Sequence, residues 1–166
     1  MPSWSTRDSY CWDSSVFFAW LKNESCHPLD SIAIVLDEIE KGDVNLIVPM
    51  TAYEELRYER LDDEQKRLLD GFLERSNVML ADLSPPVSDE AAEVRRRSED
   101  ANVLTKPADS RIAATAIVYG AAVLHTLDDG LLRLNRSTVV RDLPICKPKP
   151  LSGQRALPHG MPDRVS

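Results

Sequence analysis

The chain has 166 residues, of which 43% are hydrophobic and 28% charged, and its formal net charge is −7. This length suits one domain with a substantial core and is short for two. The acidic balance argues against a passive nucleic-acid binder, which usually presents a basic surface, but it permits an enzyme whose clustered carboxylates are offset by bound cations.

Nothing in the sequence indicates a membrane or a secretory route. No apolar run approaches the ~20 residues that a membrane-spanning helix needs, and the N-terminus lacks a basic segment followed by an apolar one. The three cysteines, Cys11, Cys26 and Cys146, are too widely spaced for a disulfide framework or a zinc ligand set. We therefore expect free or buried thiols and a cytoplasmic location.

Short apolar strands and amphipathic helices alternate along the first half of the chain. The helix expected over residues 28–42 shows the clearest periodicity, because Ile32, Val35, Leu36 and Ile39 form one stripe and Gly42 suits its C-terminal cap. In chain order we expect a strand over 9–13, helices over 14–23 and 28–42, a strand over 44–49, helices over 50–61 and 62–76, and a strand over 77–83.

The second half continues the same alternation after a break at Pro85 and Pro86. Ser88 is expected to cap a charged helix over 88–104, and Gly120 to end a helix over 108–119. Strands are expected over 121–126 and 137–143. Strands that alternate with helices predict right-handed crossovers and a mostly parallel sheet covered on both faces.

The composition changes near residue 144. Residues 144–166 contain five of the 11 prolines and show little periodicity of apolar residues. We expect residues 1–143 to form one domain and residues 144–166 to form an extended or disordered tail. An arm that contacts RNA or a partner is the alternative interpretation of this tail.

Acidic residues follow several of the expected strands. Asp13 follows the first strand, Glu54 and Glu55 follow the strand over 44–49, Asp128 follows the strand over 121–126, and Asp109 opens a helix. Each one alone has an ordinary explanation as a helix cap, a turn residue or a complement to a helix dipole. Together they converge on one crevice, because ligands of open parallel sheets bind beyond the carboxyl ends of the strands.

Carboxylates crowded in this way predict a cation site. Like charges held close together are costly unless a cation binds them, and hard oxygen ligands suit Mg²⁺ or Mn²⁺. Two such ions can activate water and stabilise the leaving oxygen in phosphodiester cleavage.

Three segments carry a resemblance to PIN-domain nucleases. "DSSVFFAWL" looks like their first motif, an aspartate at a strand end followed by Ser/Thr and Asn/Ser, and "VPMTAYEEL" is similar to their second, Thr-x-x-Glu, which selects Glu54 over Glu55. "ADSRIAATAIVYGAAVLHTLDDGL" looks like the third and fourth, an aspartate, a helix of small residues, a strand and Thr-x-Asp, which selects Asp128. The resemblance spans roughly residues 9–143.

The resemblance implies an α/β/α sandwich with a central, mostly parallel sheet and Mg²⁺- or Mn²⁺-dependent cleavage of RNA. It implies that Asp13, Glu54, Asp109 and Asp128 are catalytic, that Asp13, Asp109 and Asp128 bind the metal, and that Ser15 and Thr126 support them. A chain this small resembles the VapC-type toxins of bacterial toxin–antitoxin pairs, which implies a cognate antitoxin partner and a homodimer. Ser15 departs from the family, where many members carry Asn, and Leu131 stands where an aromatic residue is frequent.

Two alternatives stay open beside the toxin. The chain could be a PIN nuclease with a housekeeping RNA substrate, or a non-catalytic PIN-like binding module. Among the other polar residues, His125 is expected to be a core residue, and the run Arg95–Arg97 is expected to be a solvated helix face paired with neighbouring acids. The candidates for phosphate contacts are Arg57, Arg60, Lys106 and Arg111.

Overall fold

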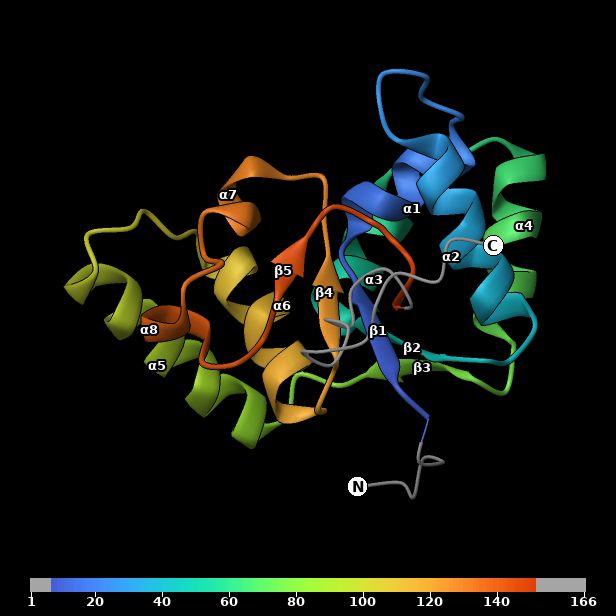
Figure 1. Ribbon diagram of the computed structural model, residues 1–166. Coiled ribbons are helices and arrows are strands. Elements are labelled where there is room, and N and C mark those ends of the chain that lie inside the picture. The colour runs from blue at the N-terminus through green and yellow to red at the C-terminus, as the bar shows by residue number, and fades with distance from the viewer. Residues whose placement is uncertain (1–6, 152–166) are drawn as a thin grey trace, which may run out of the picture.

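The structure is a computed structural model that describes residues 7–151. Its centre is a five-stranded sheet in the order β3-β2-β1-β4-β5, and every neighbouring pair is parallel (Figure 1). The strands are β1 (Ser9–Trp12), β2 (Asn45–Pro49), β3 (Val78–Ala81), β4 (Val123–His125) and β5 (Ile145–Cys146). Parallel strands require crossover connections, and the helices between them supply these.

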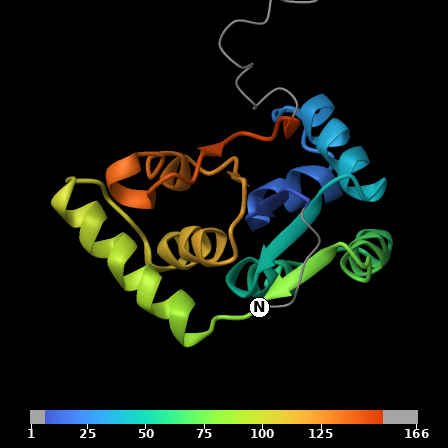
Figure 2. The same cartoon turned by 60° about the horizontal axis from the view of Figure 1, so that its bottom comes forward.

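Helices cover both faces of the sheet, which confirms the expected α/β/α architecture. Figures 1 and 2 show α5, α6 and α8 on one side of the sheet and α1, α2 and α4 on the other. The helices are α1 (Ser14–Leu21), α2 (Leu29–Glu40), α3 (Met50–Tyr58), α4 (Asp63–Leu73), α5 (Pro85–Asp100), α6 (Pro107–Val118), α7 (Asp129–Leu132) and α8 (Ser137–Val140).

The central strands divide their side chains between two hydrophobic cores. Tyr10 and Trp12 of β1 belong to the core under α1, α2 and α4, whereas Cys11 belongs to the core under α6. This alternation is the two-residue period of a strand, with both faces buried because helices cover both. The central strands read as near-continuous apolar runs for that reason.

Helix α6 lies close to the sheet because its packing residues are small. Ala113, Ala114 and Ala116 are fully buried, and α5 packs against the outer side of the same helix. Since α6 begins at Pro107, close packing also fixes the position of Asp109 in its first turn.

Two expected helix and strand boundaries are wrong. Helix α5 begins at Pro85 with Ser84 in the N-cap position, so the two prolines open the helix and Ser88 does not cap it. Proline suits the first turn, where its missing N–H has no helical partner. Residues 137–140 form the short helix α8, not a strand, and Val139 and Val140 are buried against the α6 side of the sheet.

The last strand lies inside the segment that was expected to be a tail. β5 pairs with β4, placing Leu124 opposite Ile145, and Ile145 is buried. The Leu151 backbone N–H donates to the Tyr10 hydroxyl at 2.7 Å, so the chain is fastened to the core up to this point. The expectation of disorder from residue 144 onward therefore fails for residues 144–151, and its remainder, 152–166, lies outside the described residues.

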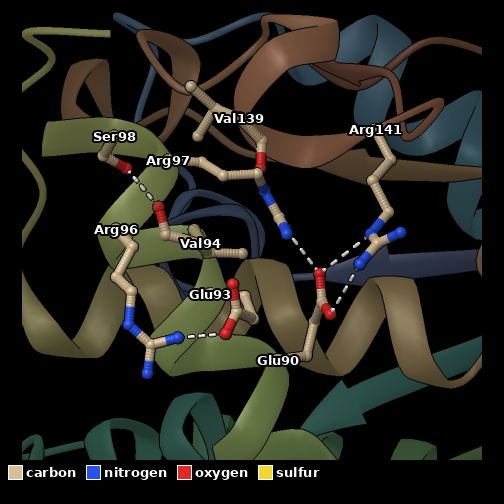
Figure 3. A network of polar contacts seen from close by, with 8 residues as sticks. All are labelled: Glu90, Glu93, Val94, Arg96, Arg97, Ser98, Val139 and Arg141. Atoms are coloured by element: carbon tan, nitrogen blue, oxygen red, sulfur yellow. Dashed lines mark hydrogen bonds and ion pairs between the residues drawn. The ribbon is translucent and has the colours of Figure 1, made fainter. Parts of the chain in front are cut away.

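An ion-pair network joins α5 to α8 (Figure 3). Glu90 accepts from Arg97 at 2.5 Å and from Arg141 at 3.2 Å, and Arg97 also donates through Nε to the Val139 carbonyl at 2.8 Å. Arg96 pairs with Glu93 on the same helix. Arg96 thus lies on an exposed face and pairs with a neighbouring acid as expected, whereas Arg97 also pairs with an acid but is largely buried between α5 and α8, contrary to the expected solvated face.

Within residues 7–151, none of the helices combines the length and the apolar character that crossing a bilayer demands.

Candidate metal centre

The site is built at the carboxyl ends of two paired strands. Trp12 of β1 lies opposite His125 of β4, so the next residues of each strand, Asp13 and Thr126, lie side by side. The Thr126 hydroxyl donates to Asp13 Oδ2 at 2.8 Å, and both side chains are buried. The two strand ends that the sequence predicts to meet do meet.

Hydroxyl groups hold the Asp13 carboxylate on both of its oxygens. The Ser15 hydroxyl donates to Asp13 Oδ1 at 2.6 Å, while the Leu127 backbone N–H donates to Ser15 Oγ at 2.9 Å. Thr126 Oγ1 in turn accepts from the Asp128 backbone N–H at 2.9 Å. Ser15 and Thr126 therefore fix Asp13 and the loop that carries Asp128, in line with the supporting positions expected for them.

Asp128 is positioned by the short helix that follows it. Its side chain caps α7 by accepting from the Leu131 backbone N–H at 3.1 Å. The ordinary explanation for this residue, a capped turn, is therefore correct as a description of how the carboxylate is held. Capping fixes one oxygen and leaves the other for a ligand.

Asp109 approaches Asp128 across the backbone of Gly130. A Cβ atom at Gly130 would lie 2.9 Å from Asp128 Oδ2 and 3.0 Å from Asp109 Oδ2, closer than ordinary contact. Both carboxylates therefore converge on a cradle that only glycine leaves open. The pair Asp129-Gly130 is typical of a turn, and this pattern gives no sign of the close approach.

The fourth carboxylate near this group belongs to Glu55, not to Glu54. The Ser14 hydroxyl donates to Glu55 Oε2, and the charge of Glu55 contributes to raising the pKa of Asp109. Glu54 is exposed on α3, whereas Glu55 is partly buried. Successive residues lie about 100° apart around a helix, so only one of the two can face the aspartates, and the Thr-x-x-Glu spacing favoured the other.

Burial and mutual repulsion make these aspartates reluctant to ionise. Burial raises the pKa of Asp13 from 3.8 to about 7, against the lowering effect of the Ser15 and Thr126 hydrogen bonds and with an added contribution from Asp128. The pKa of Asp109 rises to about 6, first through burial and then through Asp128, with Lys106 partly offsetting the rise. The protein alone supplies too little positive charge to hold both ionised at neutral pH.

The residues fit a hard divalent cation. Their donors are carboxylate and hydroxyl oxygens, which Mg²⁺ and Mn²⁺ prefer, and a cation would relieve the repulsion that raises the two pKa values. The aspartates do not form a tight three-ligand group with all ligand atoms within 4.8 Å of one another, a spacing that the described residues show at Glu24, Cys26 and His27. Wider spacing suits Mg²⁺, which usually keeps several of its waters and binds proteins through one or two carboxylates.

A groove of about 720 Å³ lies along α3 and the start of α6 and reaches the site at Glu55 and at Ala108, which precedes Asp109. Its lining includes acidic, basic and aromatic side chains: Thr51, Glu54, Glu55, Arg57, Tyr58 and Arg111. Glu54 is thus at the rim of the groove although it does not join the aspartates.

Two further expectations can be compared with the structure. His125 is fully buried and its Nδ1 accepts from Trp12 Nε1 at 3.2 Å, so it is a core residue as expected. Arg57, a candidate for phosphate contacts, is instead paired with Asp70 at 2.7 Å and lies over the Tyr53 ring, with 5.0 Å from its guanidinium carbon to the ring centroid.

Comparison with known proteins gives one family. The PIN domain family matches residues 10–137. No curated protein matches the chain.

Solved structures of similar fold cover most of the chain. One is VapBC2 from Rickettsia felis, whose structure was solved with a DNA fragment from its promoter. It is 20% identical and covers 82% of this chain and 96% of its own, with a TM-score of 0.61. FitAcB from Neisseria gonorrhoeae is 23% identical over 84% of this chain and 97% of its own, with a TM-score of 0.57. DNA-bound VapBC from Salmonella typhimurium is 17% identical and covers 83% of this chain and 96% of its own, also with a TM-score of 0.57. At these identities the likeness shows the fold.

Proposed function

This chain belongs to the PIN-domain family, and from that premise we propose that it is a Mg²⁺- or Mn²⁺-dependent endoribonuclease of the VapC type. PIN domains are generally nucleases, so hydrolysis of a phosphodiester bond is the activity that the family favours. The finer parts of the proposal are the metal, the RNA substrate and the antitoxin partner.

One observation carries the proposal. Asp13, Asp109 and Asp128 converge at the carboxyl end of the sheet, and the pKa values of Asp13 and Asp109 are raised to about 7 and about 6. Buried like charges destabilise a fold unless a cation binds them. A purely structural role would not explain why three carboxylates are kept together here.

The three aspartates are the proposed metal ligands. When bound, Mg²⁺ or Mn²⁺ supplies a Lewis acid that stabilises the charge developing on the scissile phosphate. Asp13 is kept in one orientation by the hydroxyls of Ser15 and Thr126, and Asp128 by its capping bond to Leu131. Fixed ligands need no reorganisation during the reaction.

Glu55 is the proposed fourth catalytic acid, in place of Glu54. Its Oε2 atom accepts from the Ser14 hydroxyl, which leaves Oε1 to orient the attacking water and take its proton. Its charge contributes to raising the pKa of Asp109, so the two carboxylates are close enough to interact. Glu54 remains the matched comparison, because it precedes Glu55 on the same helix.

The groove along α3 is the proposed path of the RNA strand. It runs from the carboxylates past Arg111, which supplies a cation for a phosphate, and Tyr58, whose ring is 90% exposed and free to stack on a base. A single strand fits this arrangement better than a duplex, because stacking on an aromatic ring requires an unpaired base.

Cleavage of RNA by the purified full chain tests the proposal. We expect products with Mg²⁺ or Mn²⁺, none after removal of divalent ions by a chelator, and a loss of about 10³-fold or more in Asp13→Asn, since metal contacts contribute several kcal/mol to catalysis. Activity that survives the chelator, or an Asp13→Asn variant that cleaves normally, would contradict the metal mechanism.

The toxin assignment rests on the fold shared with the VapBC and FitAcB structures. It predicts that the chain acts on cytoplasmic RNA, forms a homodimer and is neutralised by a cognate antitoxin. Expression in bacteria should slow growth, Asp13→Asn should abolish the effect, and co-expression of the antitoxin should restore growth. Harmless expression of an enzyme that cleaves RNA in vitro would favour the housekeeping nuclease.

A non-catalytic binding module is the remaining alternative. It predicts RNA or protein binding without cleavage, and stability that does not respond to Mg²⁺ or Mn²⁺. Calorimetric titration of the full chain with Mn²⁺, compared with Asp109→Asn, separates the module from the enzyme, because a module has no need of a functional cation site.

A further inference from the structure

A second group of metal-ligating side chains lies in the connection between α1 and α2, above α1 in Figure 1. Glu24, Cys26 and His27 each direct one ligand atom into a space where all three atoms lie within 4.8 Å of one another. Cys26 is exposed, and the other two residues are half-buried. None of them belongs to the aspartate site.

We propose that these three residues bind a divalent transition metal ion, with Zn²⁺ the best fit. A thiolate, an imidazole and a carboxylate form the donor set of a borderline metal, whereas Mg²⁺ and Mn²⁺ select oxygen ligands. Two anionic ligands also balance the charge of one divalent ion. The fourth position of a tetrahedral ion is left to water.

The distance between the Glu24 and His27 ligand atoms suits one shared ion, and the Cys26 sulfur lies within 4.8 Å of both. Glu24 Oε2 and His27 Nε2 are 3.1 Å apart. Two ligands on a tetrahedral Zn²⁺ at about 2.0–2.1 Å each are separated by about 3.3 Å, so a small side-chain adjustment suffices. Without metal, the two atoms form a hydrogen bond or ion pair. The exposed Cys26 thiol takes no part in that pair and would be the third ligand of the ion.

Backbone hydrogen bonds hold the three residues in one turn. Asn23, two residues after the last residue of α1, has a φ of 50°, and the Glu24 N–H donates to the Ala19 carbonyl at 3.1 Å, which is the Schellman pattern of a helix C-terminus. The His27 N–H then donates to the Glu24 carbonyl at 3.1 Å, closing a four-residue turn. Ligands already gathered in a turn lose little conformational freedom when the ion binds.

The surroundings leave the Glu24 carboxylate available. The nearest lysine in sequence, Lys22, is paired with Glu59 at 2.9 Å instead. Within residues 7–151, Glu24 forms its ion pair with His27, so a cation that binds there displaces no lysine or arginine. The widely spaced cysteines give no hint of the site, because two of its three ligands are not cysteine.

Cobalt substitution in the full chain tests the site without RNA or catalysis. Co²⁺ added to metal-free protein should produce a thiolate-to-cobalt charge-transfer band, and Zn²⁺ should abolish the band while excess Mg²⁺ should not. Cys26→Ser should remove the band. Glu24→Gln and His27→Gln should each weaken Co²⁺ affinity at least about tenfold, since even the loss of a hydrogen-bond partner of a ligand costs about that much.

Two controls make the result decisive. Cys146→Ser removes a half-buried thiol elsewhere and should keep the band, and Asp13→Asn should keep it because the aspartate site contains no thiol. Absence of the band in the unmodified chain, or its persistence in Cys26→Ser, would overturn the proposal. Unchanged affinity in both Glu24→Gln and His27→Gln would also overturn it, because it would leave only an exposed thiolate.

Discussion

The aspartate site and the Glu90 network are two clusters of partly or fully buried carboxylates that behave in opposite ways. Glu90 faces two guanidinium groups, from Arg97 and Arg141, and although its burial acts in the raising direction, these hydrogen bonds and charges lower its pKa (Figure 3). Asp13 faces two neutral hydroxyls and another carboxylate, and its pKa rises to about 7. The same functional group is stabilised as an anion in one place and destabilised in the other.

The difference separates a cluster that the protein neutralises itself from the one that we propose to bind metal. In the network the protein supplies its own counterions, so the charges join α5 to α8 without help from solution. In the site, among the described residues, Lys106 offsets the raised pKa of Asp109 only in part, and a cation from solution would complete the charge balance. Carboxylates that lack protein counterions are the ones to suspect of function.

The largest expected effect is on the rate of RNA cleavage, when one carboxylate of the aspartate site and one of the Glu90 network are substituted in turn. Asp109→Asn should lower RNA cleavage by about 10³-fold, because it removes a metal ligand, while Glu90→Gln should leave cleavage per folded molecule within about twofold. Rates measured under single-turnover conditions, with circular dichroism to verify folding, check both. A Glu90→Gln variant as inactive as Asp109→Asn would break the comparison.

The stability of the metal-free protein should fall as pH rises from about 4 to about 7. Folded Asp13 keeps its proton up to about pH 7 and the unfolded chain releases it near 3.8, so the folded state binds more protons in this window and loses stability across it. Asp109, with its pKa at about 6, adds a contribution of the same sign. With these pKa values the two contributions together come to about 5 kcal/mol between about pH 4.5 and 7.5, measurable by urea denaturation in chelator.

Asp13→Asn is the control for this pH dependence, because asparagine does not titrate. It should flatten the slope and make the metal-free protein more stable at neutral pH. Glu90 contributes with the opposite sign, since its lowered pKa stabilises the fold above its usual value of 4.5 and that stability is lost on acidification. A wild-type slope that survives in Asp13→Asn would show that the site is not the source.

Separate substitutions of the two adjacent glutamates, Glu54 and Glu55, test which of them belongs to the site. Glu55→Gln should reduce cleavage about 10²-fold, the usual loss for a group that moves a proton, and Glu54→Gln should reduce it less than about threefold because Glu54 is exposed on the groove rim. Both variants keep the shape of the side chain. The reverse order of effects would restore the assignment made from the Thr-x-x-Glu spacing.

The smallest expected effect is on stability in the network. Glu90→Gln should destabilise the fold by about 1–2 kcal/mol, because it leaves Arg97 and Arg141 without a counterion in a partly buried setting. Glu93→Gln is the matched control on the same helix, since its partner Arg96 is well exposed and such pairs contribute about 0–1 kcal/mol. Equal melting temperatures for both variants would mean that the network is only a surface feature.

The sequence predicts the sheet and the meeting of the strand ends, but not the finer placements. Asp13 and Asp128 were found because an apolar run followed by aspartate marks the end of a buried parallel strand. Glu55 was not selected because the choice between the two glutamates rested on the Thr-x-x-Glu spacing, although α3 begins at Met50 as expected and adjacent residues face about 100° apart around a helix. Residues 137–140, Ser-Thr-Val-Val, suggested a strand by composition, yet burial of Val139 and Val140 under the sheet is satisfied by a single helical turn.

Gly130 gives the site a mutational signature of its own. A Cβ atom added here would meet oxygens of Asp109 and Asp128, and the Asp128 oxygen is held in place by the cap of α7. Every single-base change in a glycine codon that alters the amino acid adds such a side chain. In a saturation library selected for cleavage, this position should therefore tolerate no replacement, not even alanine, although it is neither a ligand nor ionisable and lies in a four-residue helix that other small residues could form.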